Sequence, residues 1–124
     1  MPFEQTLNLA VTRRHKDGVT ITCPLRPDFL NNTGIVHGGV IAAIADEAAW
    51  YAVEYHYGTG TTCTTTELKV NYLRAMKGER ITARATIARA GQTLCVSRVD
   101  VFDEKKNLSA LAIVTYMVLP PKRR

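Results

Sequence analysis

The spacing of apolar and polar residues along the chain predicts one helix and several β-strands. Residues 19–24 carry the β-branched run VTITC after the turn residues Lys16-Asp17-Gly18, which indicates a first strand. Four later segments alternate apolar with polar residues or are apolar throughout, and we predict strands at residues 62–73, 80–90, 94–102 and 108–119. The last segment is almost continuously apolar, which is typical of a strand at the centre of a sheet.

Two of these segments carry further information. The alternation in residues 62–73 predicts two faces, one with Thr66, Leu68, Val70 and Tyr72 and the other with Thr65, Glu67, Lys69 and Asn71. Residues 76–79 have the composition of a hairpin turn, so the strands on either side are expected to be antiparallel neighbours. In residues 94–102 the alternation slips between Val96 and Val99, which predicts a bulge or burial on both faces.

A helix is predicted from about Gly39 to His56, because this segment is rich in alanine and has no proline or internal glycine. Its residues are apolar on nearly every side, which is typical of a buried helix, and its alanines allow other elements to pack closely. A loop at residues 26–39, rich in Asn, Gly and Pro, leads into it.

This order of elements predicts an α+β fold in which an antiparallel sheet of five to six strands wraps around one long central helix. All 124 residues are expected to form a single domain, residues 1–124, with its core at about residues 18–119. Such a sheet leaves edge strands and an outer face uncovered. We therefore expect at least a homodimer, with sheets joined edge to edge.

Composition narrows the class of protein. With 46% apolar and 22% charged residues the chain resembles an ordinary globular protein, and it has no apolar run of the roughly 18 residues that a membrane span needs. Its first residues lack the pattern of a signal peptide, so a cytoplasmic protein without a membrane partner is expected. The three cysteines are far apart in the sequence and have no metal-ligand spacing, so we expect neither disulfides nor a metal site.

The net charge of +5 is unevenly distributed, because 12 of the 16 Lys and Arg residues lie from Lys69 onward. This half of the chain is expected to attract an anion, either nucleic acid or a phosphate-bearing small molecule. Charge alone does not choose between them. The sequence shows no aromatic-basic RNA motif and no recognition helix, so a nucleic-acid partner is not expected.

The candidate chemistry begins at His37-Gly38-Gly39, directly at the predicted helix start. The first N–H groups of a helix have no intrahelical partner and bind anions, and such a site can stabilise the oxyanion that forms when a carbonyl is attacked. The alternative is a tight turn in which His37 only caps the helix.

Asp46 and Glu47 stand in the middle of the otherwise apolar helix. A carboxylate among alanines is costly unless it is paired or faces a wet cleft, which makes both residues candidate bases or nucleophiles. The alternative is that they pair with Arg or Lys or point to solvent. Nine residues separate His37 from Asp46, which is about 13–14 Å along a helix. If both serve one reaction, they must come from different subunits, and a symmetric dimer would hold two equivalent sites.

The sequence of residues 31–52, NNTGIVHGGVIAAIADEAAWYA, carries an HGG-x6-D motif, followed by the strand motif NYLR and a glycine turn at Gly91. Together with residues 65–79 and 88–118, this run resembles the hotdog-fold acyl-CoA thioesterases of the phenylacetate-pathway (PaaI-like) type, in the 4-hydroxybenzoyl-CoA thioesterase superfamily. The resemblance covers about residues 18–119. It implies the hotdog fold, hydrolysis of a small, aromatic or medium-chain acyl-CoA to the acid and CoA, and no metal or redox cofactor.

The resemblance also implies roles for individual residues. Asp46 matches the catalytic carboxylate, as general base or nucleophile, and Gly38 matches the backbone N–H that polarises the thioester carbonyl. His37 matches the residue that orients the substrate near the sulfur. Asn31 falls where the family often has a polar residue near the thioester, and Thr65 falls where several members position the attacking water.

Further substrate and CoA contacts are implied for a second set of residues: Gly39, Thr64, Arg74, Arg89, Gly91 and Gln92. The resemblance implies homodimers with shared active sites, commonly assembled as dimers of dimers. Two alternatives stay open at this point: a non-catalytic acyl-CoA binding or sensing protein, and a hotdog dehydratase or hydratase.

Overall fold

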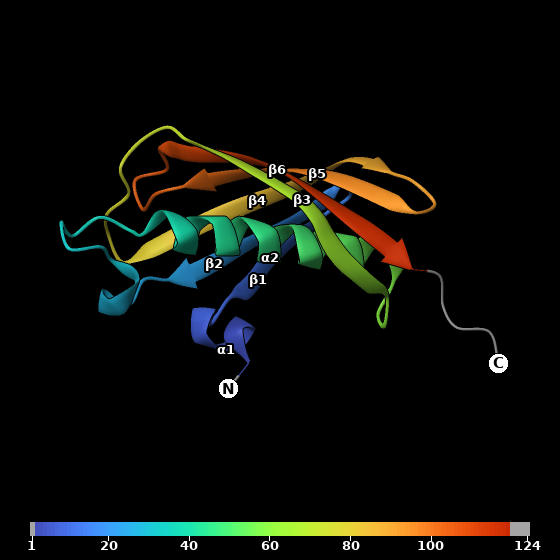
Figure 1. Ribbon diagram of the computed structural model, residues 1–124, viewed down its shortest axis with the longest axis horizontal. Coiled ribbons are helices and arrows are strands. Elements are labelled where there is room, and N and C mark those ends of the chain that lie inside the picture. Colours follow the sequence, from blue (N-terminus) through green and yellow to red (C-terminus); the bar gives the residue numbers. More distant parts are fainter. Residues whose placement is uncertain (1, 120–124) are drawn as a thin grey trace.

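A computed structural model of the protein describes residues 2–119. These residues form two α-helices, one short 3-10 helix and six strands: α1 (Phe3–Leu7), β1 (Ala10–His15), β2 (Gly18–Pro24), η1 (Pro27–Phe29), α2 (Gly38–Tyr57), β3 (Thr62–Tyr72), β4 (Arg80–Ala90), β5 (Leu94–Phe102) and β6 (Leu108–Leu119). The strands form one antiparallel sheet in the order β1-β2-β4-β5-β6-β3. Figure 1 shows α2 running along one face of the curved sheet, with β1 and α1 on one side of it and β6 and β3 on the other. The predicted α+β architecture is confirmed.

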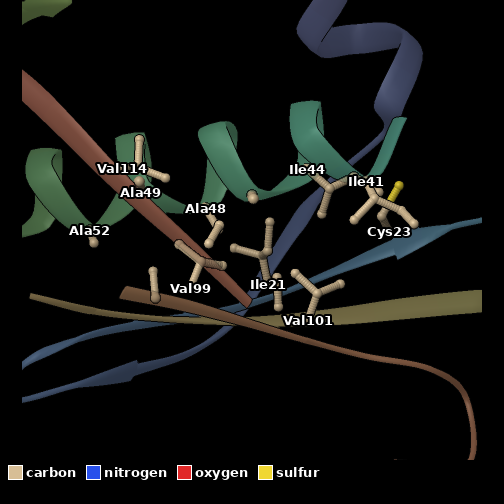
Figure 2. Packing of buried hydrophobic residues seen from close by; sticks show 14 of the residues in the cluster. Ile21, Cys23, Ile41, Ile44, Ala48, Ala49, Ala52, Val99, Val101 and Val114 are labelled. Atoms are coloured by element: carbon tan, nitrogen blue, oxygen red, sulfur yellow. The ribbon is translucent and has the colours of Figure 1, made fainter. Parts of the chain in front are cut away.

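The core lies between α2 and the inner face of the sheet. One side of α2 is buried against the strands, and Figure 2 shows Ile41, Ile44 and Ala48 pointing toward them. The strands contribute β-branched residues to the same layer, among them Val99 and Val101. Alanines on the helix leave room for these side chains, so helix and sheet pack closely.

Most predicted elements are found where the sequence places them. β4, β5 and β6 have the predicted bounds, and α2, β2 and β3 differ from theirs by at most one residue at each end. Two elements, α1 and β1, were not predicted from the sequence. β1 is largely exposed and carries Arg13 and Arg14, so it lacks the alternation that identifies a half-buried strand. Neither α1 nor α2, nor any other helix within residues 2–119, is both long and apolar enough to cross a membrane.

The predicted hairpin at residues 76–79 is wrong. Among the strands that the structure describes, β3 pairs with β6 alone, whereas β4 pairs with β2 and β5. The connection of residues 73–79 therefore crosses the end of the sheet. The composition of residues 76–79 predicts a turn at that point of the chain. It does not determine which strands become neighbours, because that depends on which strands can be buried. β3 exposes most of its residues and suits an edge, whereas β4 buries Ile81, Ala83 and Ala85 and suits the interior.

The slip predicted in β5 also has a different explanation. Cys95, Ser97, Val99 and Val101 are all buried on one face, so the alternation in β5 is regular and Ser97 simply takes an inward position. The irregularities lie in the pairing with the neighbouring strands: the register with β4 shifts between Ile87 and Arg89, and the register with β6 shifts between Val101 and Phe102.

β3 contains a bulge that the alternation did not predict. Thr65 pairs with Tyr116 and Glu67 pairs with Thr115, so Thr66 is an extra residue. Directly paired residues share a face of the sheet, and Tyr116 is buried on the inner face. The bulge therefore turns Thr65 to the inner face, which it shares with Leu68, Val70 and Tyr72. The alternation in the sequence had predicted Thr65 on the opposite face from these three residues.

Candidate active site

The N-terminus of α2 is capped by His37. The His37 backbone is extended (φ −60°, ψ 134°), and its ring Nδ1 accepts a hydrogen bond from the Gly39 N–H at 2.9 Å. Gly38 is the first residue of the helix, so its N–H has no intrahelical acceptor, and no group within the described part of the chain accepts it. This amide combines a free donor with the positive end of the helix dipole.

The cap also determines which nitrogen of His37 carries the proton. Because Nδ1 accepts from the Gly39 N–H, the neutral ring has its proton on Nε2. His37 is therefore a helix cap, and the other nitrogen of its neutral ring carries a donor beside Gly38.

Tyr72 fixes the backbone around this amide from the edge strand β3. Its hydroxyl donates to the Gly38 carbonyl at 2.6 Å, and a Cβ atom added to Gly38 would lie 3.3 Å from the Tyr72 ring. Gly38 and Tyr72, with Ile41, Leu73 and other residues, line an open cleft of about 340 Å³. We call His37, Gly38, Gly39 and Tyr72 the amide end of α2.

Asn31 shapes the loop before the helix. Its side-chain oxygen accepts hydrogen bonds from the Thr33 N–H at 2.9 Å, the Thr33 hydroxyl at 2.7 Å and the Ile35 N–H at 3.2 Å. These bonds occupy the carbonyl oxygen, so only the Asn31 Nδ2 group is left to reach a ligand.

Asp46 lies in the middle of α2, half-buried, about 12 Å along the helix axis from Gly38. Its Oδ1 accepts from the Thr65 hydroxyl at 2.8 Å and from the Tyr116 hydroxyl at 2.9 Å. No Lys or Arg in the described part of the chain forms an ion pair with it. We call Asp46, Thr65 and Tyr116 the carboxylate centre.

The carboxylate centre depends on elements that are distant in sequence. Thr65 reaches Asp46 because the β3 bulge turns it inward, and Tyr116 reaches it because β6 lies next to β3. Tyr116 was not among the predicted site residues. In the sequence it looks like any other core position of an apolar strand, and only the packing of β6 beneath α2 shows its contact with Asp46.

Glu47, the neighbour of Asp46, has a different environment. Burial, with smaller effects from the charges of Glu4 and Asp46, raises the pKa of Glu47 to about 7. No hydrogen-bond donor within residues 2–119 contacts its carboxylate. Glu47 is therefore a carboxyl group without the two donors that hold Asp46.

The residues predicted to contact CoA fall into two groups at opposite ends of α2. Arg74 lines the cleft beside Gly38. Arg89, Gly91 and Gln92 lie around the β4–β5 turn, where the Tyr57 hydroxyl at the other end of α2 donates to the Gly91 carbonyl at 2.6 Å. One chain alone does not bring these two groups together.

Thr64 and the cysteines lie apart from this chemistry. Thr64 pairs with the exposed Met117 and therefore faces the outer side of the sheet, away from Asp46. Burial raises the pKa of the Cys23 thiol to about 11 and raises the pKa of Cys63 and Cys95 as well. The thiols thus lack the depressed pKa of a nucleophilic cysteine.

Residues 33–110 match the family model described as Thioesterase superfamily, which covers more than half of the chain. The chain belongs to the thioesterase superfamily. This thioesterase is 33% identical to the medium/long-chain acyl-CoA thioesterase YigI of Escherichia coli, in an alignment covering 95% of this chain and 86% of that protein.

Solved structures agree with this assignment. A thioesterase of Haemophilus influenzae superposes with a TM-score of 0.86 at 25% identity, over 93% of this chain and 80% of that one. The TT0310 protein of Thermus thermophilus gives a TM-score of 0.83 at 28% identity, over 96% and 98% of the two chains. The expected hotdog-fold thioester hydrolase is thereby confirmed.

Proposed function

We propose that this thioesterase hydrolyses acyl-CoA thioesters to a carboxylic acid and CoA, using the Gly38 amide and the Asp46 carboxylate. The observation that supports this most directly is the free N–H of Gly38 at a helix N-terminus, next to an open cleft and on the same helix as an oriented carboxylate. These are the two groups that hydrolysis of a thioester needs: a donor for the oxyanion and an acceptor for the proton of water.

In the proposed reaction, Asp46 takes a proton from water while the water oxygen bonds to the thioester carbon. The carbonyl electron pair moves to the oxygen, which the Gly38 N–H and the helix dipole stabilise. When the carbonyl re-forms, the C–S bond breaks, and the leaving thiolate receives the proton from Asp46. The Nε2–H of His37 can donate to the sulfur or carbonyl of the bound thioester. Direct attack by Asp46, followed by hydrolysis of an anhydride, uses the same groups.

We propose that each site is shared between two subunits. Gly38 and Asp46 are about 12 Å apart along one helix, too far for one carbonyl carbon to contact both. An active site therefore combines the amide end of one chain with the carboxylate centre of its partner.

The edge strand β3 is the proposed contact between the two chains. β1, the other edge, is short and exposes Arg13 and Arg14, a pattern that discourages pairing. β3 carries both Thr65 and Tyr72 on its inner face, one beside Asp46 and the other beside Gly38. Antiparallel self-pairing of β3 near Lys69 would carry Thr65 of each chain toward Tyr72 of its partner.

A dimer of two such dimers is also proposed, as the family resemblance implies. The exposed apolar residues on the outer face of the sheet, among them Leu94, Ile113 and Met117, support a second contact there.

The acyl group is proposed to be a medium or long aliphatic chain, with aryl groups as the competing class. The identity to a thioesterase named for medium and long chains supports the first class, as does the apolar lining of the cleft by Ile35, Ile41 and Leu73. We propose that Arg74, beside this cleft, contacts a CoA phosphate, and that the partner's β4–β5 turn supplies further contacts. The reaction needs no metal or redox cofactor. Three free cysteines support a reducing compartment, so we place the enzyme in the cytoplasm.

The test is thiol release from a panel of acyl-CoAs: short, medium and long aliphatic, phenylacetyl and benzoyl. Asp46→Asn is expected to lower kcat by about 100-fold or more, because it removes the acid–base group. Glu54→Gln, a substitution on the same helix, is the matched control and should retain activity. Near wild-type turnover in Asp46→Asn would overturn the role of Asp46, and Glu47 would be tested next. Binding of acyl-CoA without hydrolysis by the wild type would favour a sensing protein.

A further inference from the structure

Tyr116 is a buried residue that contacts Asp46 and that no sequence pattern identified. Its side chain rises from the inner face of β6, and only 4% of the residue is exposed. The hydroxyl oxygen lies 2.9 Å from Asp46 Oδ1 and 3.1 Å from the Asp46 backbone carbonyl oxygen. One phenol thus contacts both the side chain and the main chain of a single helical residue.

Toward the Asp46 carboxylate the phenol acts as a donor. Burial raises the pKa of Tyr116 well above its ordinary value, with a smaller contribution from the nearby charge of Asp46. The titratable groups that face the hydroxyl are Asp46 and Glu47, both acidic, and its other close polar neighbour is the Thr65 hydroxyl. Tyr116 therefore keeps its proton and donates a hydrogen bond to Asp46 rather than serving as a base.

The two oxygens of Asp46 differ as a result. Oδ1 accepts from both Thr65 and Tyr116, at 2.8 Å and 2.9 Å. Within residues 2–119 no protein group donates to Oδ2. A carboxylate held through one oxygen by donors from two different strands has a defined plane, and its other oxygen is left for a ligand.

We propose that Tyr116 is a positioning residue that, together with Thr65, holds Oδ1 of Asp46 so that Oδ2 is the oxygen that reacts. The inference rests on the proposed function of Asp46. It also assigns the Thr65 hydroxyl proton to Asp46 rather than to the attacking water. Tyr116 does not touch the substrate and acts only through the carboxylate.

Tyr116→Phe tests this directly, because it removes the hydroxyl and keeps the ring that packs beneath α2. We expect kcat to fall about tenfold, the scale for loss of one hydrogen bond to a charged group, while KM stays unchanged. The matched control is Ser109→Ala, which removes another buried hydroxyl from the same strand, about 23 Å from Tyr116 along β6. This control should keep the wild-type kcat.

A double-variant experiment separates positioning from a general effect on the fold. In the Asp46→Asn background, Tyr116→Phe should leave the residual rate unchanged, because the group it positions is already lost. A tenfold fall in both backgrounds would overturn the proposal and show a structural role. A wild-type kcat in Tyr116→Phe, with Asp46→Asn inactive, would also overturn it while leaving the proposed function intact. An active Asp46→Asn variant would instead remove the proposed function itself.

A third substitution tests the second donor. Thr65→Ser keeps the hydroxyl and should retain most of the activity, whereas Thr65→Val should lower kcat about as much as Tyr116→Phe. With both donors removed, in Thr65→Val/Tyr116→Phe, kcat should approach that of Asp46→Asn. Full activity in the double variant would contradict the proposal.

Discussion

The amide end and the carboxylate centre lie on the same helix, but they are built by different means. At the amide end the proposed oxyanion donor is a backbone N–H, which has no intrahelical acceptor because Gly38 begins α2. At the carboxylate centre the proposed base is the side chain of Asp46, and donors from β3 and β6 hold it. Apart from Tyr72, which comes from β3, the first arrangement is local in sequence, and it is largely exposed. The second is assembled by the fold and partly buried.

The difference shows which substitutions each half should tolerate. The amide end depends on backbone geometry, so side-chain changes near Gly38 other than those at His37 and Tyr72 should matter only through crowding. The carboxylate centre depends on three side chains that contact one another, so changes there should be strongly coupled. A symmetric dimer would bring one half of each kind into every site.

The largest expected effect comes from deleting the backbone donor itself. Gly38→Pro removes the N–H but keeps the helix, because proline is favoured at the first helical position and His37 already has the extended backbone that precedes proline. We expect kcat to fall about 100- to 1000-fold, as when an oxyanion donor is removed.

Gly38→Ala is the control for this change. It crowds the Tyr72 ring in the same way, with a Cβ contact of 3.3 Å, but it keeps the N–H. Circular dichroism checks that both variants retain the helix. If the proline variant were as active as the alanine variant, the Gly38 amide would not be the oxyanion donor.

Mixing two inactive variants tests whether the two halves of a site come from different chains. A heterodimer of Gly38→Pro and Asp46→Asn chains would hold one site with both wild-type groups and one site with neither. Random mixing makes about half of the dimers mixed, so about a quarter of the wild-type activity should return. Co-expression with two affinity tags and thiol release measure it. No recovery in purified mixed dimers would place each complete site within one chain.

The smallest expected effect is on stability and concerns Glu47, which lacks the two hydrogen-bond donors that hold Asp46. The folded state raises the pKa of Glu47 from 4.5 to about 7, so it binds this proton more tightly than the unfolded chain does. Neutral Glu47 therefore adds to the free energy of unfolding. This stabilisation is fully present below about pH 4.5 and is lost as the pH rises to about 7.

The Gln side chain in Glu47→Gln is neutral at every pH, so the stability of this variant should not fall through ionisation at position 47. Its Tm should exceed that of the wild type by about 2 °C at pH 8, and the difference should shrink toward pH 5. Thermal unfolding at the two pH values measures it, with Glu54→Gln as the control. A Tm difference that does not vary with pH would contradict the assigned environment of Glu47.

The parts of the molecule that the sequence predicted well are those with local causes. The bounds of β4, β5 and β6 follow from alternation, and the amide end follows from a histidine and two glycines beside an apolar helix. Asp46 stood out because a carboxylate among alanines needs an explanation.

The parts that were missed depend on contacts between distant segments. Residues 73–79 cross the end of the sheet because β3 lies at its edge and β4 in its interior. This order depends on which strands can be buried, and the composition of the turn does not encode it. Tyr116 could not be assigned without knowing that β6 passes beneath α2. The orientation of Thr65 was predicted wrongly because one extra residue in β3 shifts the alternation.

That extra residue, Thr66, has a consequence for how the sequence can change during evolution. Removing one residue from a regular strand inverts every side chain on one side of the deletion, which is why strands tolerate deletions less readily than loops. In β3 the loss of this one residue would instead leave the side chains on their present faces. Without Thr66, Thr65 would still pair with Tyr116 and Glu67 with Thr115, and every inward residue of the strand would stay inward. Homologous chains of different length can therefore align through a gap in the middle of this strand while keeping the same contacts to Asp46.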